Sequence, residues 1–585
     1  MVLSSSFRTL LRLNRQSRSG QYVALFPNWN RAKSYYVTTP IYYVNSVPHL
    51  GHLYTTILAD ASCRWEKMKN VNSTFTDSKL VTGTDEHGLK VKQAADAQQM
   101  DPLVFCDQVS ERFRKMIKVF GIDASDFVRT TEQRHYEAVQ HFWQKVEENG
   151  FIYKGQYKGW YSIPDEAYVS ESAITLEKDK ISGETYRISK ESGHRLQWME
   201  EENYMFKLSA FTDQVREWIL SDSQRVHPVK FRAKLLHELQ TPLEDISISR
   251  DVSKVPWGVP VPGDSAHRVY VWFDALVNYL TAAGYPQVNG TTYSNMWPAD
   301  VHIVGQDIMR FHAVYWPAFL LAAGLKLPKQ VVVHSHWLCD NRKMSKSTGN
   351  VVDPFETALS VTPEGLRYFL LKQGVLGDDC NFSEKLLYNG LNSDLANDYG
   401  NCLHRIMGKR LNPLKVYPGE LVGTSNADHA IDDDSIKEVI RSVQHLAEEI
   451  QPYYRDFYFY KGINAIMKVV QLVNIMVTKH KVWELKRTDS NQAAFLDTVL
   501  YCSYEAMRVC SILLQPIVPE LASFALSKLG VPQDCRGLDD AMKSFASLEG
   551  GQDKMVGQPL GHDMKPLFRR LELPESLTTK QSQAQ

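Results

Sequence analysis

The sequence predicts an α/β protein in which a split parallel sheet, interrupted by a small inserted domain, precedes an α-helical bundle. Up to about residue 154, and again after about residue 246, apolar strand patterns alternate with helical apolar spacing. That order is typical of a parallel sheet covered by helices. Beyond about Leu391 strand patterns end and long amphipathic stretches follow, which predicts the bundle.

The first half of the sheet region contains two strand-helix pairs. "SYYVTTPIYYV" is a strand pattern and "HLYTTILADASCRWEKM" has helical spacing, while "KLVTGTDEHG" reads as a buried strand. "DPLVFCDQVSERFRKMIKVFGI" is expected to be a helix that starts at Asp-Pro and ends at Gly121. Since parallel strands end at one edge of their sheet, we expect functional loops at those ends.

The pattern changes within 155–245 to short, polar, aromatic-rich segments such as "GWYSIPDEAYV", which predicts an inserted domain. The α/β alternation returns in "RVYVWFDALVNYL", "DVHIVGQDIMRFHAVYWPAFLLAAG" and "KQVVVHSHWL". The insertion therefore divides the sheet region into two halves.

The first 33 of the 585 residues contain five arginines, one lysine and many serines, and the first acidic residue is Asp60. This composition is typical of an organelle transit peptide, and the alternative is a basic arm that contacts RNA. Removal of those charges changes the formal net charge from −1 to −7, so bulk charge does not favour nucleic-acid binding. No run reaches the roughly 18 apolar residues of a membrane span.

The eight cysteines are scattered and form no CxxC pair. This spacing predicts no structural zinc knuckle and favours a reducing compartment.

Two short motifs follow strands of the same split sheet. "PHLGH" brings His49 and His52 to the start of a helix, and "KMSKS" brings Lys343 and Lys346 into a polar loop. Taken separately, the histidines could be metal ligands or core residues, and the lysines could belong to a solvated turn. Because both motifs follow strand ends, we expect them to face one crevice.

"PHLGH" resembles the HIGH signature, and "KMSKS" matches the second signature, of the class I aminoacyl-tRNA synthetases. The resemblance implies a Rossmann-type catalytic domain that activates an amino acid with ATP and Mg²⁺. The catalytic residues would be His49, His52, Lys343 and Lys346. ATP would be bound by Gly51, Gly305, Asp307 and the two lysines. Such chemistry needs groups that position a polyphosphate and neutralise its charge.

Within this class the chain is most similar to methionyl-tRNA synthetases of the mitochondrial type, from about Tyr35 to about Glu572. The resemblance implies a methionine site formed by Ile41, Tyr43, Asp85, Trp272, Ala275, Leu276, Tyr279, Ile308 and His312. Aromatic faces suit a thioether, Asp85 would bind the α-ammonium group, and His312 would add a weak polar contact to sulfur. The alternative is that Trp272 and Tyr279 are only core residues.

The small insertion separates the chain from related enzymes for isoleucine, valine and leucine. These need an editing domain, because a pocket alone separates similar apolar side chains only about 10- to 200-fold. An insertion of about 90 residues is too short for such a domain. A cysteinyl enzyme should show a Cys/His zinc cluster, and the sequence shows none.

The resemblance also implies that Asn401, Arg405 and Trp483 read a CAU anticodon of tRNA(Met). An aromatic ring would stack on an unpaired base and polar groups would bond its edge. The alternative is that Asn401 and Arg405 cap or pair within the bundle.

The domain prediction combines these patterns with the resemblance. It comprises a transit peptide (1–33), a first catalytic half (34–154), a connective insertion without a zinc knuckle (155–245), a second half (246–340), a KMSKS-loop and stem-contact segment (341–390), an anticodon-binding bundle (391–573) and a disordered tail (574–585). We expect a monomer in the mitochondrial matrix, without zinc, that ligates L-methionine to tRNA(Met). The leader also fits a plastid address. Alternative functions are an HxGH nucleotidyltransferase that charges no tRNA and an inactive RNA-binding relative.

Overall fold

The computed structural model describes most of the chain after the leader. The described residues are 35–45, 47–69, 78–162, 167–169, 171–178, 183–190, 193–286, 296–344, 349–418, 433–545, 554–561, 563 and 565–574. The predicted transit peptide, the tail after 574 and Lys346 lie outside these residues.

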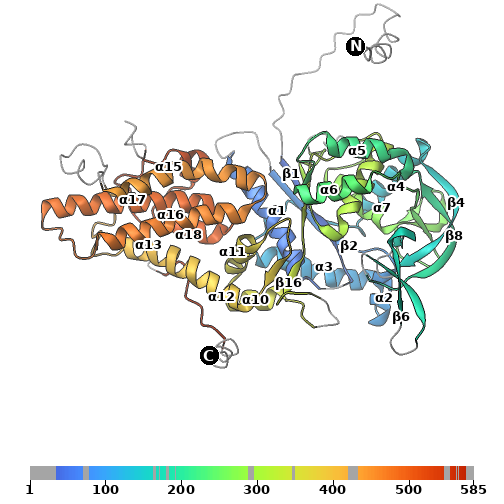
Figure 1. Cartoon of the computed structure of the whole chain (residues 1–585), viewed down its shortest axis with the longest axis horizontal. Coiled ribbons are helices and arrows are strands. Elements are labelled where there is room, and N and C mark those ends of the chain that lie inside the picture. Colours follow the sequence, from blue (N-terminus) through green and yellow to red (C-terminus); the bar gives the residue numbers. More distant parts are fainter. Residues whose placement is uncertain are drawn as a thin grey trace, which may run out of the picture. The chain divides into compact units, whose positions relative to one another are not determined.

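A six-stranded parallel sheet carries the predicted α/β region (Figure 1). Its strands lie in the order β3-β2-β1-β14-β15-β9 and all neighbours are parallel. The bounds are β1 Tyr35–Tyr43, β2 Ser78–Asp85, β3 Asp126–Arg129, β9 Val226–His227, β14 Val301–Gly305 and β15 Val331–His334. The first and second predicted halves thus meet where β1 pairs with β14.

Side chains of these strands enter two separate hydrophobic cores, one on each face. Leu80, Ile303 and Val332 belong to one core, and their neighbours Val81 and Val304 belong to the other. Consecutive residues of a strand point to opposite faces, and a parallel sheet is covered on both. The near-continuous apolar runs of the strands follow from this double burial.

The helices of the first half are α1 Leu50–Lys69, α2 Leu89–Ala97, α3 Pro102–Val119 and α4 Gln133–Glu148. Helix α3 confirms the prediction from Asp-Pro: the Asp101 side chain accepts hydrogen bonds from the N–H groups of Leu103 and Val104. The chain leaves α3 through Gly121, whose φ of 60° suits glycine.

The segment predicted as an insertion contains antiparallel strands and one unexpected parallel strand. Strands β4 Ile152–Ser162, β5 Ala167–Val169, β8 Gln197–Phe206 and β10 Ile246–Ser247 form one sheet, and β6 Ile174–Lys178 pairs with β7 Thr185–Ser189. Between α5 Thr212–Leu220 and α6 Val229–Glu238, however, β9 joins the parallel sheet beside β15. A two-residue strand is too short to give a periodic signal in the sequence.

The second half also differs from the predicted alternation at its start. Strand β13 Asp264–Val269 lies in a small antiparallel sheet with β11 Ser249–Asp251 and β12 Pro260–Val261, outside the parallel sheet. Periodicity predicts a strand but not its partner. The helical elements that follow are α7 Val271–Leu276, α8 Asn278–Ala282, η4 Gln306–Ile308, the π-helical turn η5 Phe311–Tyr315 and α9 Trp316–Ala322.

A second three-stranded sheet and three helices connect the parallel sheet to the bundle. They are β16 Trp337–Cys339, β17 Arg342–Lys343, β18 Cys380–Phe382, α10 Pro354–Val361, α11 Pro363–Gln373 and α12 Glu384–Leu391. The bundle contains the π-helical segment η6 Asn392–Gly400, α13 Asn401–Ile406, α15 Asp434–Arg455, α16 Phe459–Lys479, α17 Ser490–Leu514, α18 Pro519–Lys528 and α19 Leu538–Met542. Helix α1 packs against α11, α15 and α19, so one core continues from the sheet into the bundle. Among the described residues, no helix combines the length and apolar character needed to cross a membrane.

Candidate active site

A cleft of about 920 Å³ opens at the carboxyl ends of β1, β2, β14 and β15. Parallel sheets bind ligands at this edge. The predicted site residues that line the cleft are Ile41, Tyr43, His49, Gly51, His52, Asp85, Trp272, Ala275, Leu276, Tyr279, Gly305, Asp307, Ile308, His312 and Lys343. Segments almost 300 residues apart in sequence therefore meet around one cavity.

The two histidines of "PHLGH" are held in one tautomer by the backbone. Nδ1 of His49 accepts the Gly51 N–H at 3.1 Å, and Nδ1 of His52 accepts the His49 N–H at 3.3 Å. In a neutral imidazole the other nitrogen then carries the proton. The rings stack with centroids 3.6 Å apart, so both Nε2–H groups are donors on one rigid pair.

This arrangement favours anion binding over metal binding. A metal on Nε2 would require a proton on Nδ1, where it would face a backbone N–H. The histidines also lie at the first turn of α1, where backbone N–H groups attract anions. In the described part of the chain, no group of three His, Cys, Asp or Glu side chains is placed to hold a metal ion.

Gly51 is required by the close approach of the His49 ring. A Cβ at this position would lie 3.1 Å from Cε1 and 3.2 Å from Nδ1 of His49. We expect Gly51→Ala to lower the turnover of amino-acid activation roughly tenfold, because small displacements of catalytic groups are costly. Gly390→Ala in α12, where a Cβ meets no atom within 4 Å, is the matched control. Equal activation rates for both variants and the wild type would contradict this role.

The first signature segment contacts the chain shortly after the second. The Leu50 N–H at the start of α1 donates to the Val352 carbonyl at 3.3 Å, shortly after the "KMSKS" loop. The Asn350 side chain donates to the Lys343 carbonyl at 3.1 Å, which joins the two ends of that loop. Lys343 is exposed and faces the cleft.

The inner end of the cleft is aromatic and contains a hydrogen-bonded Tyr-His pair. His312 donates from Nδ1 to the Ile308 carbonyl at 2.9 Å, so its Nε2 accepts the Tyr279 hydroxyl proton at 2.7 Å. Both nitrogens of His312 thus have protein partners, and the predicted contact to sulfur would require one of these bonds to break. Trp272 also lines the cleft and stacks on Phe311 with centroids 3.7 Å apart.

The buried histidines of this site are expected to destabilise the folded protein at acidic pH. Burial lowers the pKa of His312 and of His334 to about 4. Their ordinary pKa is about 6.5, so the unfolded chain binds more protons below that pH and stability is lost as the pH falls towards 4. We expect each residue to cost about 2 kcal/mol of unfolding free energy between pH 7.5 and pH 5. Denaturant unfolding of His312→Gln should show a shallower pH dependence than the wild type, and an identical dependence would contradict the shift.

Helix α7, which carries pocket residues, is held by a buried carboxylate of its own, Asp274. Asp274 lies 2.6 Å from His87 Nδ1 and 2.7 Å from His135 Nε2, and all three side chains are buried. Although burial raises the pKa of Asp274, the two histidines outweigh it and lower that pKa. Because His87 lies in the loop after Asp85, its contact with Asp274 holds that loop against α7. Asp85 and the pocket residues of α7 are therefore positioned by the same buried contact.

Sequence reasoning missed several polar residues of the cleft. His336 donates from Nε2 to Asp307 at 2.8 Å and accepts the Gln306 amide on Nδ1 at 2.5 Å. His334 Nε2 lies 2.7 Å from the Thr55 hydroxyl in α1. The run "HSH" directly after the strand "VVV" was the available signal, since it places both histidines at the carboxyl end of β15.

The three predicted anticodon residues lie on two neighbouring segments of the bundle. The Arg405 guanidinium lies over the Trp483 ring, 5.3 Å from its centroid, and Trp483 is 39% exposed. Asn401 is exposed on the same helix, α13. Arg405 also donates to Thr478 at 3.3 Å, so the alternative of pairing within the bundle holds in part.

Comparison with known proteins decides the family. The model of the class I tRNA synthetases of the M type matches residues 35–407. The mitochondrial methionine–tRNA ligase of Takifugu rubripes is 44% identical, with 92% of this chain and 90% of the relative covered. The chain belongs to the methionyl-tRNA synthetases.

Other members of the methionyl-tRNA synthetase family agree in sequence and in fold. The human mitochondrial methionine–tRNA ligase is 41% identical over 92% of this chain and 90% of its own length. A Mycobacterium tuberculosis methionyl-tRNA synthetase in complex with methionyl-adenylate superposes with a TM-score of 0.82 at 34% identity, covering 92% of this chain and all of that one. The predicted fold class, a split parallel-sheet domain followed by a helical region, is confirmed.

Proposed function

We propose that the chain activates L-methionine with ATP and transfers the methionyl group to tRNA(Met). The methionine carboxylate attacks the α-phosphorus, which yields methionyl-adenylate and releases pyrophosphate, and the terminal ribose hydroxyl of tRNA then displaces AMP. The observation that carries this proposal is the single cleft lined by His49, His52 and Lys343 together with the aromatic pocket. The relative solved with methionyl-adenylate supports the same intermediate.

Each substrate group has a matching partner in the cleft. Asp85, only 7% exposed at the end of β2, would bind the α-ammonium group. The side chain of methionine would lie among Ile41, Tyr43, Trp272, Ala275, Leu276, Tyr279, Ile308 and His312. Asp307 would hold the ATP ribose, oriented by His336, with Gly305 beside the nucleotide.

The triphosphate would be held by donors from both signature segments. The Nε2–H groups of His49 and His52 act beside Gly51 at the start of α1, and Lys343 and Lys346 would neutralise the departing pyrophosphate. Mg²⁺ would arrive on ATP and supply further charge neutralisation. Magnesium commonly binds through phosphates and water rather than a protein cage, which fits a cleft without a three-ligand cluster among its described residues.

The bundle would read a CAU anticodon through Trp483, Arg405 and Asn401, which assigns the predicted range 391–573 to tRNA binding. Exposed aromatic rings stack on unpaired bases, and such a stack contributes about 1–3 kcal/mol. Trp483→Ala should therefore raise the KM for tRNA roughly 30-fold and leave methionine activation unchanged. Leu414→Ala is the control, because Leu414 is also an exposed apolar side chain, at 80% exposure against 39% for Trp483. A fall in activation instead would contradict the assignment.

Two assays in sequence test the whole proposal. Purified protein should support methionine-dependent ATP–pyrophosphate exchange and then charge a tRNA with a CAU anticodon. Exchange without charging would favour the nucleotidyltransferase alternative, and tRNA binding without exchange would favour the inactive RNA-binding alternative.

We also propose a mitochondrial location, within the matrix, and a monomeric state. The relatives are named mitochondrial, and the leader composition agrees with an organelle address. Import into isolated mitochondria and light scattering of the purified chain test the two statements.

A further inference from the structure

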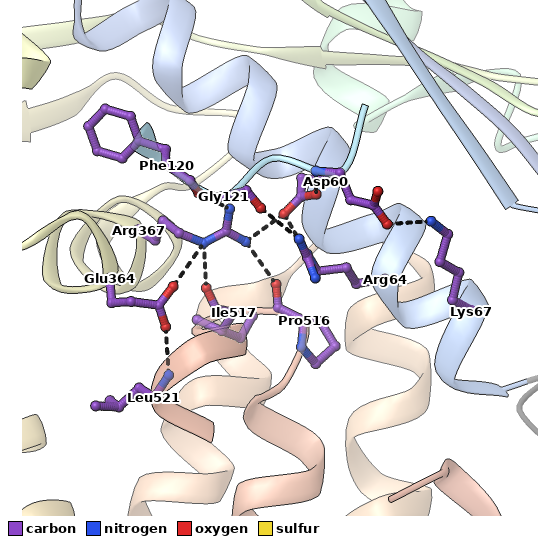
Figure 2. Close-up of polar contacts among 11 residues, drawn as sticks. Asp60, Arg64, Lys67, Phe120, Gly121, Glu364, Arg367, Pro516, Ile517 and Leu521 are labelled. Carbon is purple, nitrogen blue, oxygen red and sulfur yellow. Dashed lines mark hydrogen bonds and ion pairs between the residues drawn. The ribbon is translucent and has the colours of Figure 1, made fainter. Parts of the chain in front are cut away.

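One buried guanidinium joins the helix of the first signature to the bundle (Figure 2). Arg367 of α11 pairs with Asp60 of α1, Nη2 to Oδ2 at 2.7 Å, and both side chains are fully buried. Its other bonds reach three backbone carbonyls: Phe120 at 3.1 Å, Ile517 at 3.1 Å and Pro516 at 3.3 Å. Pro516 and Ile517 lie between α17 and α18, so one side chain connects α1, the α3–β3 loop and the bundle.

The neighbouring charges extend the same joint. Arg64 donates to the same Asp60 oxygen at 2.8 Å and to the Gly121 carbonyl at 2.7 Å, both on the sheet side. Glu364 of α11 lies 3.9 Å from Arg367 and accepts the Leu521 N–H in the first turn of α18 at 3.0 Å. Two arginines thus face two carboxylates (Figure 2), and the bundle contacts pass through Arg367 and Glu364.

A contribution to stability does not by itself explain why α1 and α11 are joined by a buried ion pair. Replacing such a pair by apolar side chains is commonly neutral or stabilising, because desolvation offsets the attraction. What the ion pair provides and apolar side chains do not is fixed geometry. A planar guanidinium with several fixed donors holds its partners in one arrangement. The cluster is therefore better suited to fix the position of the bundle than to strengthen its attachment.

Helix α1 connects this joint to the active site. It begins at the cleft with His52 in its first turn, and Asp60 follows two turns later. Further along, Trp65 packs on Tyr454 with centroids 5.1 Å apart, and Met68 Sδ lies 3.6 Å from Gln515 Nε2. A helix of 20 residues is a rod of about 30 Å, so its cleft end and its bundle end move together.

We propose that Arg367 is a positioning residue for charging of tRNA: it holds the bundle in register with α1 and so couples anticodon binding to transfer at the cleft. The proposal rests on the proposed function, in which the bundle binds the anticodon. Neither Arg367 nor Asp60 is among the described residues that line the cleft. Methionine activation without tRNA should therefore not depend on the joint.

Arg367→Lys is the first test, because lysine keeps the charge but cannot reach Asp60 and three carbonyls together. The rate of methionine-dependent ATP–pyrophosphate exchange should stay within about twofold of the wild type, while kcat/KM for charging a CAU tRNA should fall roughly tenfold. The preference for CAU over a tRNA with one altered anticodon base should shrink by a similar factor. Arg64→Lys is the matched control, since Arg64 shares the Asp60 oxygen and its other hydrogen bond goes to Gly121 on the sheet side. It should leave both activities within about twofold.

A double variant separates coupling from general loss of structure. If Arg367 transmits anticodon binding, Trp483→Ala should reduce charging much less in the Arg367→Lys background than in the wild type. Independent, multiplicative effects of the two substitutions on charging would overturn the proposal, and so would an equal fall in exchange and charging.

If Arg367→Lys does not fold, Glu364→Gln is the test variant. It keeps an acceptor for the Leu521 N–H but removes the negative charge beside Arg367. Charging should then fall about threefold with exchange intact, and unchanged charging would overturn the proposal. Failure of the wild type to charge any CAU tRNA would refute the proposed function instead.

Discussion

Replacing Asp85 with asparagine should raise the KM for methionine in ATP–pyrophosphate exchange about 100-fold, which corresponds to about 2.7 kcal/mol. The two side chains have the same shape, so the pocket keeps its form, while the negative charge is lost and one acceptor oxygen becomes an amide donor. Asp85 is 7% exposed at the end of β2, where water would only weakly screen the proposed ion pair with the α-ammonium group. A charge-assisted bond that binds substrate and transition state alike should affect KM more than kcat.

The control for this variant is Asp96→Asn. Asp96 lies nearby in sequence, on α2, and its side chain is 57% exposed. It should leave methionine activation unchanged, as surface ion pairs contribute little. Equal KM values for Asp85→Asn and the wild type would show that another group binds the ammonium.

Replacing His52 with alanine should lower kcat for methionine activation roughly 10²- to 10³-fold, with the KM for methionine nearly unchanged. The reason is the tautomer: the His49 N–H fixes the His52 proton on Nε2, where it can stabilise charge that develops on the phosphates. Loss of the ring also removes the stacking partner of His49 at 3.6 Å. The variant therefore removes one donor and loosens the second.

His52→Asn and His445→Ala complete this test. An asparagine amide can donate a hydrogen bond, so it should restore part of the lost rate, whereas His445 is exposed on α15 and should tolerate alanine. A larger change in the KM for methionine than in kcat would contradict a phosphate-binding role for His52.

Local elements were predictable wherever sequence neighbours determine them. Helix α3 begins with the Asp101 cap and ends before Gly121 because capping and a positive φ depend on the residues at those positions. The crevice between "PHLGH" and "KMSKS" was predictable as well, since parallel strands present their carboxyl ends together. The structure adds the hydrogen bond from Leu50 of the first motif to Val352, five residues after the second.

Features that depend on distant partners were not predictable from one sequence. Strand β9 has two residues, and only its pairing with β15 identifies it. The orientation of His312 follows from Ile308 and Tyr279 within a π-helical turn, and propensity gives no sign of such a turn. Arg367 likewise reads as an ordinary charged position of an amphipathic helix until Asp60, 307 residues earlier, is placed beside it.

The amino-acid specificity of ATP–pyrophosphate exchange tests most directly whether the cleft binds and activates methionine. The purified chain should be offered each proteinogenic amino acid in turn with ATP and Mg²⁺ at one concentration. We predict exchange with methionine about 10- to 200-fold above leucine, isoleucine, valine and cysteine, the discrimination that a fitted apolar pocket provides. Equal exchange with any of these four amino acids, or no exchange with methionine, would contradict the assignment of the cleft.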